Sequence, residues 1–287
     1  MAWNEYDIEL DGLKTHYIRT GGSGSAVVLA HGLTDAGLCM SRVATALAGE
    51  HDVVMYDARG HGGSSLPEGV RNSDTLARDL LSLIAGLALD RPAVIGHSMG
   101  ANTAARAASL DPAAIGALVL EDPPWGAAMR PPNRDWATRL AAMREASHEQ
   151  LVEMCRAENP GWHEDEVGPW AKSKREFNGA FLKGDFSLGD WRQFAPAIRC
   201  HALLVTGSPE QGAIVMPEVA AEAKGLVPGL EVVHIEGAGH NIRREGWERY
   251  LGAVRTFLGA RRQFASAALV SALSNQGGQQ SPVQPGP

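Results

Sequence analysis

Short apolar runs alternate with amphipathic stretches over most of this chain. The runs are rich in valine and leucine and occupy 26–30, 53–56, 93–95, 117–120, 202–206 and 232–235. Between them lie alanine-rich stretches or apolar residues at helical spacing, over 76–87, 101–109, 217–226 and 246–258. This alternation predicts an α/β fold, with a mostly parallel central sheet that carries helices on both faces. Two further runs, at 6–10 and 16–19 around Asp11-Gly12, predict an antiparallel pair ahead of that sheet.

The pattern changes between residues 125 and 195. Apolar runs of the strand type stop there, and charged stretches of helical character occupy 134–146 and 148–157. We therefore expect a helical insertion over 125–195 that divides the core into a first part, 1–124, and a second part, 196–260. The last segment, 261–287, ends in a stretch rich in glutamine, glycine and proline, which predicts a largely disordered C-terminal extension.

The candidate nucleophile, Ser98, stands between a predicted strand and a predicted helix. The segment reads Gly96-His97-Ser98-Met99-Gly100. Gly-x-Ser-x-Gly in a strand–turn–helix context is typical of a nucleophile elbow, in which the serine hydroxyl projects from a strained turn. The two glycines let strand and helix approach closely around it.

Two other loops carry groups that acyl transfer needs. The run at 26–30 ends in His31-Gly32, and the next residue, Leu33, is expected to donate its backbone N–H to a tetrahedral oxyanion. The N–H of Met99, directly after the nucleophile, is the expected second donor. The run at 232–235 leads into a glycine-rich loop that ends at His240, which is the candidate general base.

These motifs together resemble the α/β-hydrolase superfamily, as does the segment 57–64, Asp-Ala-Arg-Gly-His-Gly-Gly-Ser. The resemblance covers nearly all of 4–260 and implies the α/β-hydrolase fold, with 125–195 in the place of a helical lid. Such relatives are mostly esterases, lactonases, C–C bond hydrolases or cofactor-free perhydrolases, and the fold alone does not choose among them. Epoxide hydrolases and dehalogenases of the family carry an aspartate in place of Ser98, so those activities are disfavoured.

Two carboxylates compete for the role of the acid that orients His240. Relatives usually draw this acid from the loop after the strand at 202–206, where the present chain has Glu210. Other relatives draw it from the end of the strand at 117–120, where Asp122 follows Ser98 by 24 residues. We favour Asp122 and keep Glu210 as the alternative. The neighbouring Glu121 should point the opposite way along its strand.

Composition and charge favour a cytoplasmic enzyme with a small substrate. The 287 residues carry a net charge of −7 and no basic cluster, which argues against nucleic acid or an anionic membrane as partner. The first residues lack a secretory signal pattern, and no apolar stretch reaches membrane-spanning length. Three dispersed cysteines are expected to be free thiols. Motifs for a metal or a dinucleotide are absent from the sequence, so we expect no cofactor.

The expected function is hydrolysis of a carboxylic ester or lactone of a small hydrophobic compound through an acyl-enzyme. C–C bond hydrolysis or cofactor-free perhydrolysis on the same triad is one alternative, and a non-catalytic ligand-binding role is another. Trp125 and Met129 are expected to contact the substrate, because ligand pockets are commonly apolar and aromatic. The other interpretation of Trp125 and of the further tryptophans in 125–195 is that they fill the core of the helical segment.

Overall fold

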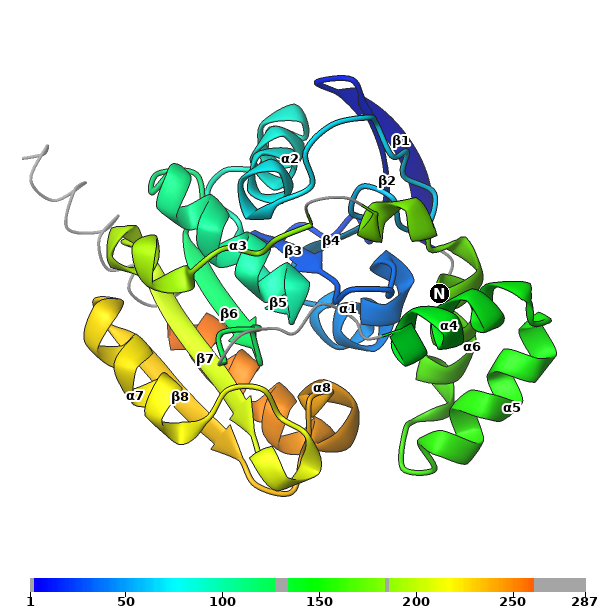
Figure 1. Ribbon diagram of the computed structural model, residues 1–287. Helices are drawn as coiled ribbons and strands as arrows, with labels where there is room; N and C mark the ends of the chain where they lie inside the picture. Colours follow the sequence, from blue (N-terminus) through cyan, green and yellow to red (C-terminus); the bar gives the residue numbers. More distant parts are fainter. Residues whose placement is uncertain (1–2, 127–133, 184–185, 261–287) are drawn as a thin grey trace, which may run out of the picture. The chain divides into compact units, whose positions relative to one another are not determined.

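A single eight-stranded sheet forms the centre of the protein (Figure 1). The computed structural model describes residues 3–126, 134–183 and 186–260, without the side chains of 134–137. The strand order is β1-β2-β4-β3-β5-β6-β7-β8. β2 pairs antiparallel with β1 and β4, and the other neighbours are parallel. The strands are β1 (Asn4–Leu10), β2 (Leu13–Arg19), β3 (Ala26–Ala30), β4 (Asp52–Tyr56), β5 (Ala93–His97), β6 (Ala117–Glu121), β7 (His201–Gly207) and β8 (Leu230–Ile235).

The central strands are apolar over most of their length because both faces of the sheet are covered. Every residue of β4, β5 and β6 is buried. This is the pattern that parallel strands need between two layers of helices, and it explains why the runs in the sequence are continuous rather than alternating. The register places Val28 between Val54 and Val94, and Leu118 beside Val94, in one row across the sheet. The predicted α/β fold with a mostly parallel sheet is confirmed.

Helices from the connections between strands complete the core. Apolar residues of α2 (Ser73–Gly86) and α3 (Met99–Leu110) pack in one cluster with the row of sheet residues that contains Val28 and Val94. Asn72 caps α2, since its side chain accepts a hydrogen bond from the N–H of Thr75. The other helices of the core are α1 (Ser41–Leu47), α7 (Pro217–Leu226) and α8 (Ile242–Glu245).

Between β6 and β7 the chain forms three consecutive helices, α4 (Arg134–Glu145), α5 (His148–Glu158) and α6 (Glu164–Glu176). They have a small core of their own, which consists of Met143, Leu151, Cys155, Val167, Trp170 and Ala171. The first two helices match the predicted stretches closely. The third helix, α6, contains Pro169 in its interior. Because proline usually ends a helix, the sequence did not predict α6 as a separate element.

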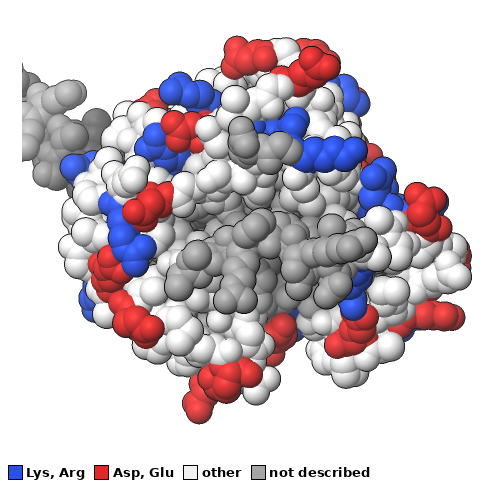
Figure 2. All heavy atoms as spheres, in the orientation of Figure 1, with Lys and Arg blue, Asp and Glu red and all other residues white. Residues whose placement is uncertain are grey.

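The chain divides into two compact units, Met1–Leu251 and Gly252–Pro287. The first contains the sheet and the three inserted helices. In the second, residues 252–260 are helical, and the predicted extension 261–287 lies outside the described residues. Among the helices that the structure describes, none has the length and apolarity to cross a membrane. Figure 2 shows acidic and basic side chains intermixed around the rim of one face.

Candidate active site

Ser98 occupies a strained turn between β5 and α3. Its backbone angles are φ 51° and ψ −115°, a combination that non-glycine residues rarely adopt. A Cβ on Gly96 would lie 2.5 Å from backbone atoms of Gly100, and a Cβ on Gly100 would collide with the carbonyl oxygen of Ala30. Both positions therefore require glycine, and the turn has the geometry that the Gly-x-Ser-x-Gly pattern predicts.

His240 and Asp122 are hydrogen-bonded to each other. His240 Nδ1 lies 2.6 Å from Asp122 Oδ2, and because an ionised carboxylate only accepts hydrogen bonds, the imidazole donates from Nδ1. Asp122 is fully buried, whereas the His240 side chain is 29% exposed. The carboxylate also accepts the backbone N–H groups of Ile214, at 2.8 Å, and Val215, at 2.9 Å. Three donors thus fix Asp122, and the lone pair on His240 Nε2 is left available.

Among the described residues, Glu210 forms no hydrogen bond or ion pair with His240. It lies in η5 (Pro209–Gln211), just after β7, with its side chain exposed to solvent. The loop after β7 nevertheless contributes to the site, because the two backbone amides that hold Asp122 belong to it.

Glu121 joins the elbow to the histidine loop. Its backbone carbonyl accepts the N–H of Ser98 at 2.9 Å. Its side chain, fully buried, accepts the N–H of Arg243 at 2.8 Å, three residues beyond His240. The two carboxylates at the end of β6 therefore point in different directions. That of Glu121 binds Arg243, and that of Asp122 binds His240. The sequence predicted this divergence and, for that reason, ranked Glu121 last among the candidate acids.

The loop after β3 runs beside Ser98. A Cβ built on Gly32 would lie 3.6 Å from the Cβ of Ser98 and 2.6 Å from His97 Nδ1, so any side chain at this position would push the loop away. The loop closes with a hydrogen bond of 3.0 Å from the N–H of Asp35 to the carbonyl of Gly32. Within the described part of the chain, no hydrogen bond is formed by the N–H of Leu33.

His97 is a residue of the site that sequence reasoning missed. Its Nε2 lies 3.0 Å from the carbonyl oxygen of His240, and the two imidazole rings are 4.7 Å apart. Burial is the main reason that the pKa of His97 lies well below its usual value, so the ring is neutral and donates from Nε2. His97 thereby holds the backbone of His240 next to the elbow. Its place as the first variable residue of the Gly-x-Ser-x-Gly motif was the available signal.

The expectation that Trp125 lines a substrate pocket is not supported. Its side chain is fully buried, its ring stacks on that of Trp191 at 4.7 Å, and its Nε1–H donates to Asn102 Oδ1 at 3.1 Å. Both the face and the polar edge of the ring are therefore used inside the protein. Met129, the other expected contact, lies outside the described residues.

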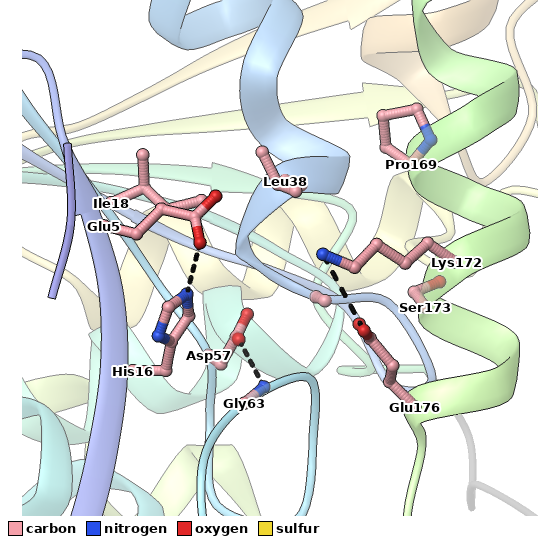
Figure 3. Close-up of a pocket in the computed structure, with 11 residues that line it drawn as sticks. Glu5, His16, Ile18, Leu38, Asp57, Gly63, Pro169, Lys172, Ser173 and Glu176 are labelled. Carbon is pink, nitrogen blue, oxygen red and sulfur yellow. Dashed lines mark hydrogen bonds and ion pairs between the residues drawn. The ribbon is translucent and has the colours of Figure 1, made fainter. Parts of the chain in front are cut away.

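A separate pocket of about 170 Å³ lies between β2, the loop after β4 and α6 (Figure 3). Its polar groups pair with one another or with backbone. Lys172 and Glu176 are 3.7 Å apart, and Asp57 accepts the N–H of Gly63 at 2.8 Å. Ser98, Asp122 and His240 are not among its lining residues. Over the described residues, no group of three or more histidine, cysteine or acidic side chains could hold a metal ion.

Comparison with known proteins identifies the family of the chain. The sequence model of the "Alpha/beta hydrolase family" matches residues 27–253. The N-formylmaleamate deformylase of Pseudomonas putida is 30% identical over 260 residues, which cover 88% of this chain and 95% of that protein. The 2-(acetamidomethylene)succinate hydrolase of Mesorhizobium japonicum is 26% identical and is covered over 91% of its length.

A crystal structure of N-formylmaleamic acid deformylase from Pseudomonas putida superposes with a TM-score of 0.73 at 26% identity. The match covers 88% of this chain and the whole of that one. Since the family model spans well over half of the sequence and the strand order agrees with it, the chain belongs to the α/β-hydrolase family.

Proposed function

We propose that this protein is a serine hydrolase that cleaves a carboxylic ester or lactone of a small compound through an acyl-enzyme. The observation that carries the proposal is the 2.6 Å hydrogen bond between His240 and the fully buried Asp122, next to an elbow that holds Ser98 in a strained conformation. A buried, amide-bound carboxylate that orients an imidazole is the arrangement that nucleophilic catalysis by serine requires.

The geometry supports a specific catalytic role for each residue of the site. His240, with its proton on Nδ1, takes the Ser98 hydroxyl proton at Nε2 as the oxygen attacks the carbonyl carbon. The negative oxygen of the tetrahedral intermediate is stabilised by the N–H groups of Leu33 and Met99. His240 then gives the proton to the leaving alkoxide as the acyl-enzyme forms. A water molecule, deprotonated in turn by His240, releases the carboxylic acid and restores the serine.

The hydrogen bonds around the site support the assignment of Leu33 as a donor to the oxyanion. The Leu33 N–H has no acceptor within the described residues, as expected of a donor that waits for an oxyanion. The Ser98 hydroxyl and His240 are not joined by a hydrogen bond there either, and catalytic hydrogen bonds are often long in unliganded enzymes.

A second candidate is the hydrolysis of a small N-acyl amide on the same residues. The two relatives named above favour it, because one is a deformylase and the other is named for an acetamido compound. We keep the ester or lactone first because the buried cations beside the site, Lys174, Arg243 and Arg244, are all paired with carboxylates and so are not free to bind an anionic substrate. The three cysteines are buried and form no disulfide, in keeping with a cytoplasmic location.

Substitution of the nucleophile tests the proposal. A fluorophosphonate probe should label the wild-type protein at Ser98 and leave Ser98→Ala unlabelled, with attachment located by peptide mass spectrometry. Hydrolysis of p-nitrophenyl acetate should fall by about 10⁴-fold in Ser98→Ala. Ser82→Ala, which removes a hydroxyl on α2 that bonds Asp11, serves as the control and should keep both activities.

A substrate panel then separates the candidates. We would compare p-nitrophenyl esters of graded length, five- and six-membered lactones, and N-formyl amides with and without a carboxylate. Higher kcat/KM on esters or lactones supports the first candidate, and higher kcat/KM on formyl amides supports the second. Labelling at another residue, or full turnover by Ser98→Ala, would exclude the acyl-enzyme mechanism.

A further inference from the structure

Six buried charged side chains form a continuous network of ion pairs. Each is at most 5% exposed. Arg243 reaches Asp35 at 3.2 Å and Glu121 at 3.5 Å. Arg244 reaches Asp35 at 3.2 Å and Glu166 at 3.1 Å. With Lys174, which bonds Asp35 at 2.8 Å, the network holds three cations and three anions, so its formal charges cancel.

The network connects four segments that are distant in sequence. Asp35 ends the loop that carries Leu33, and Arg243 and Arg244 lie in α8, directly after His240. Glu121 ends β6, next to Asp122. The fourth segment is α6, which contributes Glu166 and Lys174 from the insertion between β6 and β7. One helix of the insertion is therefore bound, through buried charges, to the loops that carry the candidate catalytic groups.

Lys174 makes the most direct of these contacts. Its ammonium donates to the backbone carbonyl of Thr34 at 2.9 Å and to Asp35 Oδ1 at 2.8 Å, with longer contacts to Thr34 Oγ1 at 3.2 Å and Ser173 Oγ at 3.3 Å. An ammonium has three N–H groups directed around one atom, which suits acceptors that surround it in this way.

The residue held by Lys174 has an unfavourable backbone conformation. Thr34 has φ 66°, in the left-handed region that β-branched residues avoid. Such a conformation persists only where surrounding contacts impose it. The Thr34 carbonyl belongs to the same peptide unit as the N–H of Asp35, which donates to the Gly32 carbonyl at 3.0 Å. The Gly32 carbonyl in turn belongs to the same peptide unit as the N–H of Leu33, so contacts that fix the Thr34 carbonyl also restrain the Leu33 N–H. The Leu33 N–H is therefore oriented by a lysine 141 residues further along the chain.

We propose that Lys174 is a positioning residue that holds the Thr34 carbonyl and so aims the Leu33 N–H at the oxyanion. This inference rests on the proposed serine hydrolase mechanism. It assigns α6 a part in the catalytic geometry in addition to any role in covering the substrate. When Lys174 is replaced by a neutral residue, Asp35 keeps its two arginine partners but the network gains one uncompensated negative charge, so a variant that keeps the positive charge is needed to isolate the effect on the loop.

The test compares Lys174→Met with Lys172→Met, a neighbouring lysine of α6 whose side chain is 52% exposed and pairs only with Glu176 at the surface. With p-nitrophenyl acetate, Lys174→Met should lower kcat by about 10- to 100-fold while KM changes by less than about threefold. Inhibition by phenylboronic acid, whose tetrahedral adduct places an oxygen at the oxyanion site, should weaken by a similar factor. Lys172→Met should match the wild type in all three constants.

A second variant keeps the test valid if Lys174→Met folds poorly. Lys174→Arg keeps the positive charge beside Asp35, but its planar guanidinium cannot direct three donors from one atom. It should unfold at a temperature close to that of the wild type and still lose about 5-fold or more in kcat. Wild-type kcat and boronate inhibition in the folded variants would overturn the inference, as would a rise in KM that alone accounts for the loss.

The rate of fluorophosphonate labelling separates this inference from the proposed function. If the wild-type protein is not labelled at Ser98, the hydrolase mechanism itself fails. If the wild type is labelled and the folded Lys174 variants are labelled at the same rate, only the positioning role fails.

Discussion

At the scale of single residues, burial distinguishes the two carboxylates that compete for His240. Asp122 is fully buried and accepts three hydrogen bonds, whereas Glu210 is exposed on a short 3-10 turn. A buried carboxylate with several donors stays in one orientation, and it can therefore hold the imidazole in one tautomer. An exposed glutamate has no such restraint.

Replacing each acid by its amide tests this difference. Asp122→Asn should lower kcat by about 10⁴-fold, because an amide can stabilise the wrong tautomer of His240. Glu210→Gln should change kcat by less than about threefold, since surface substitutions rarely disturb their surroundings. Steady-state kinetics on the best ester of the panel measures both, and far-ultraviolet circular dichroism checks that each variant is folded. A large loss in Glu210→Gln alone would reverse the assignment.

The sequence predicts the candidate catalytic side chains better than it predicts the residues that hold them in position. Ser98 and His240 are predicted from local motifs, and Asp122 is predicted from the resemblance to relatives whose acid ends the same strand. Lys174 could not be found in this way, because nothing near it in the sequence marks a partner 140 residues away. His97 was visible as a motif residue, but its bond to the backbone of His240 depends on how two loops meet.

At the scale of elements, the stacked tryptophans join the segment after β6 to η3 (Trp191–Gln193). Trp191 Nε1–H donates to the backbone carbonyl of Trp125 at 3.1 Å, so the contact has both an apolar and a polar part. Asn102 of α3 adds a third member, since it accepts from Trp125 and donates to Ser73 of α2 at 3.0 Å. The pair thus connects the insertion to two helices of the core.

We therefore expect Trp125→Ala to act on stability rather than on substrate choice. Loss of a fully buried tryptophan should lower the free energy of unfolding by about 3–5 kcal/mol, as large-to-small changes in cores do. Urea unfolding followed by circular dichroism measures this loss, and Trp247→Ala, at a half-buried position, should cost clearly less. The ratio of kcat/KM between short and long acyl esters should stay constant. A shift in that ratio would restore the pocket interpretation of Trp125.

Most elements of the core are predictable from the sequence, and the reason is their environment. Strands such as β5 and β6 are buried along their entire length, so each appears in the sequence as a continuous apolar run of the kind typical of a central parallel strand. α6 is different, because its charged side chains include Glu166 and Lys174, which are buried by pairing rather than exposed. Hydrophobic periodicity cannot detect a helix whose buried face is partly ionic.

At the scale of the whole molecule, three buried histidines link stability to pH. The pKa values of His31, His61 and His97 lie below the usual value mainly because burial disfavours the charged ring, and that of His61 is lowered to about 3. The unfolded chain binds protons at these rings as the pH falls below about 6.5, whereas the folded protein does not. The contribution of these three rings to the free energy of unfolding is therefore fully present above that pH and is lost progressively as the pH is lowered.

His61 gives the clearest test of this linkage. It lies between His31, Phe177 and Phe181, with ring centroids 4.8–5.0 Å away, so a phenyl ring suits the site. Between pH 6 and pH 5, the free energy of unfolding of His61→Phe should fall less steeply than that of the wild type, by about 1 kcal/mol per pH unit. His201→Phe, at an exposed position, should leave the slope unchanged. Equal slopes for His61→Phe and wild type would refute the linkage.

The two amides that bind Asp122 limit what side-chain mutagenesis can reveal about this site. The N–H groups of residues 214 and 215 are present whatever side chains stand there, except proline. Alanine at either position would keep both donors, so a loss on replacing the buried Val215 would report lost packing rather than lost support of the acid. Only replacement by proline, which deletes the donor itself, would reveal that a loop with no catalytic side chain helps to keep the acid in place.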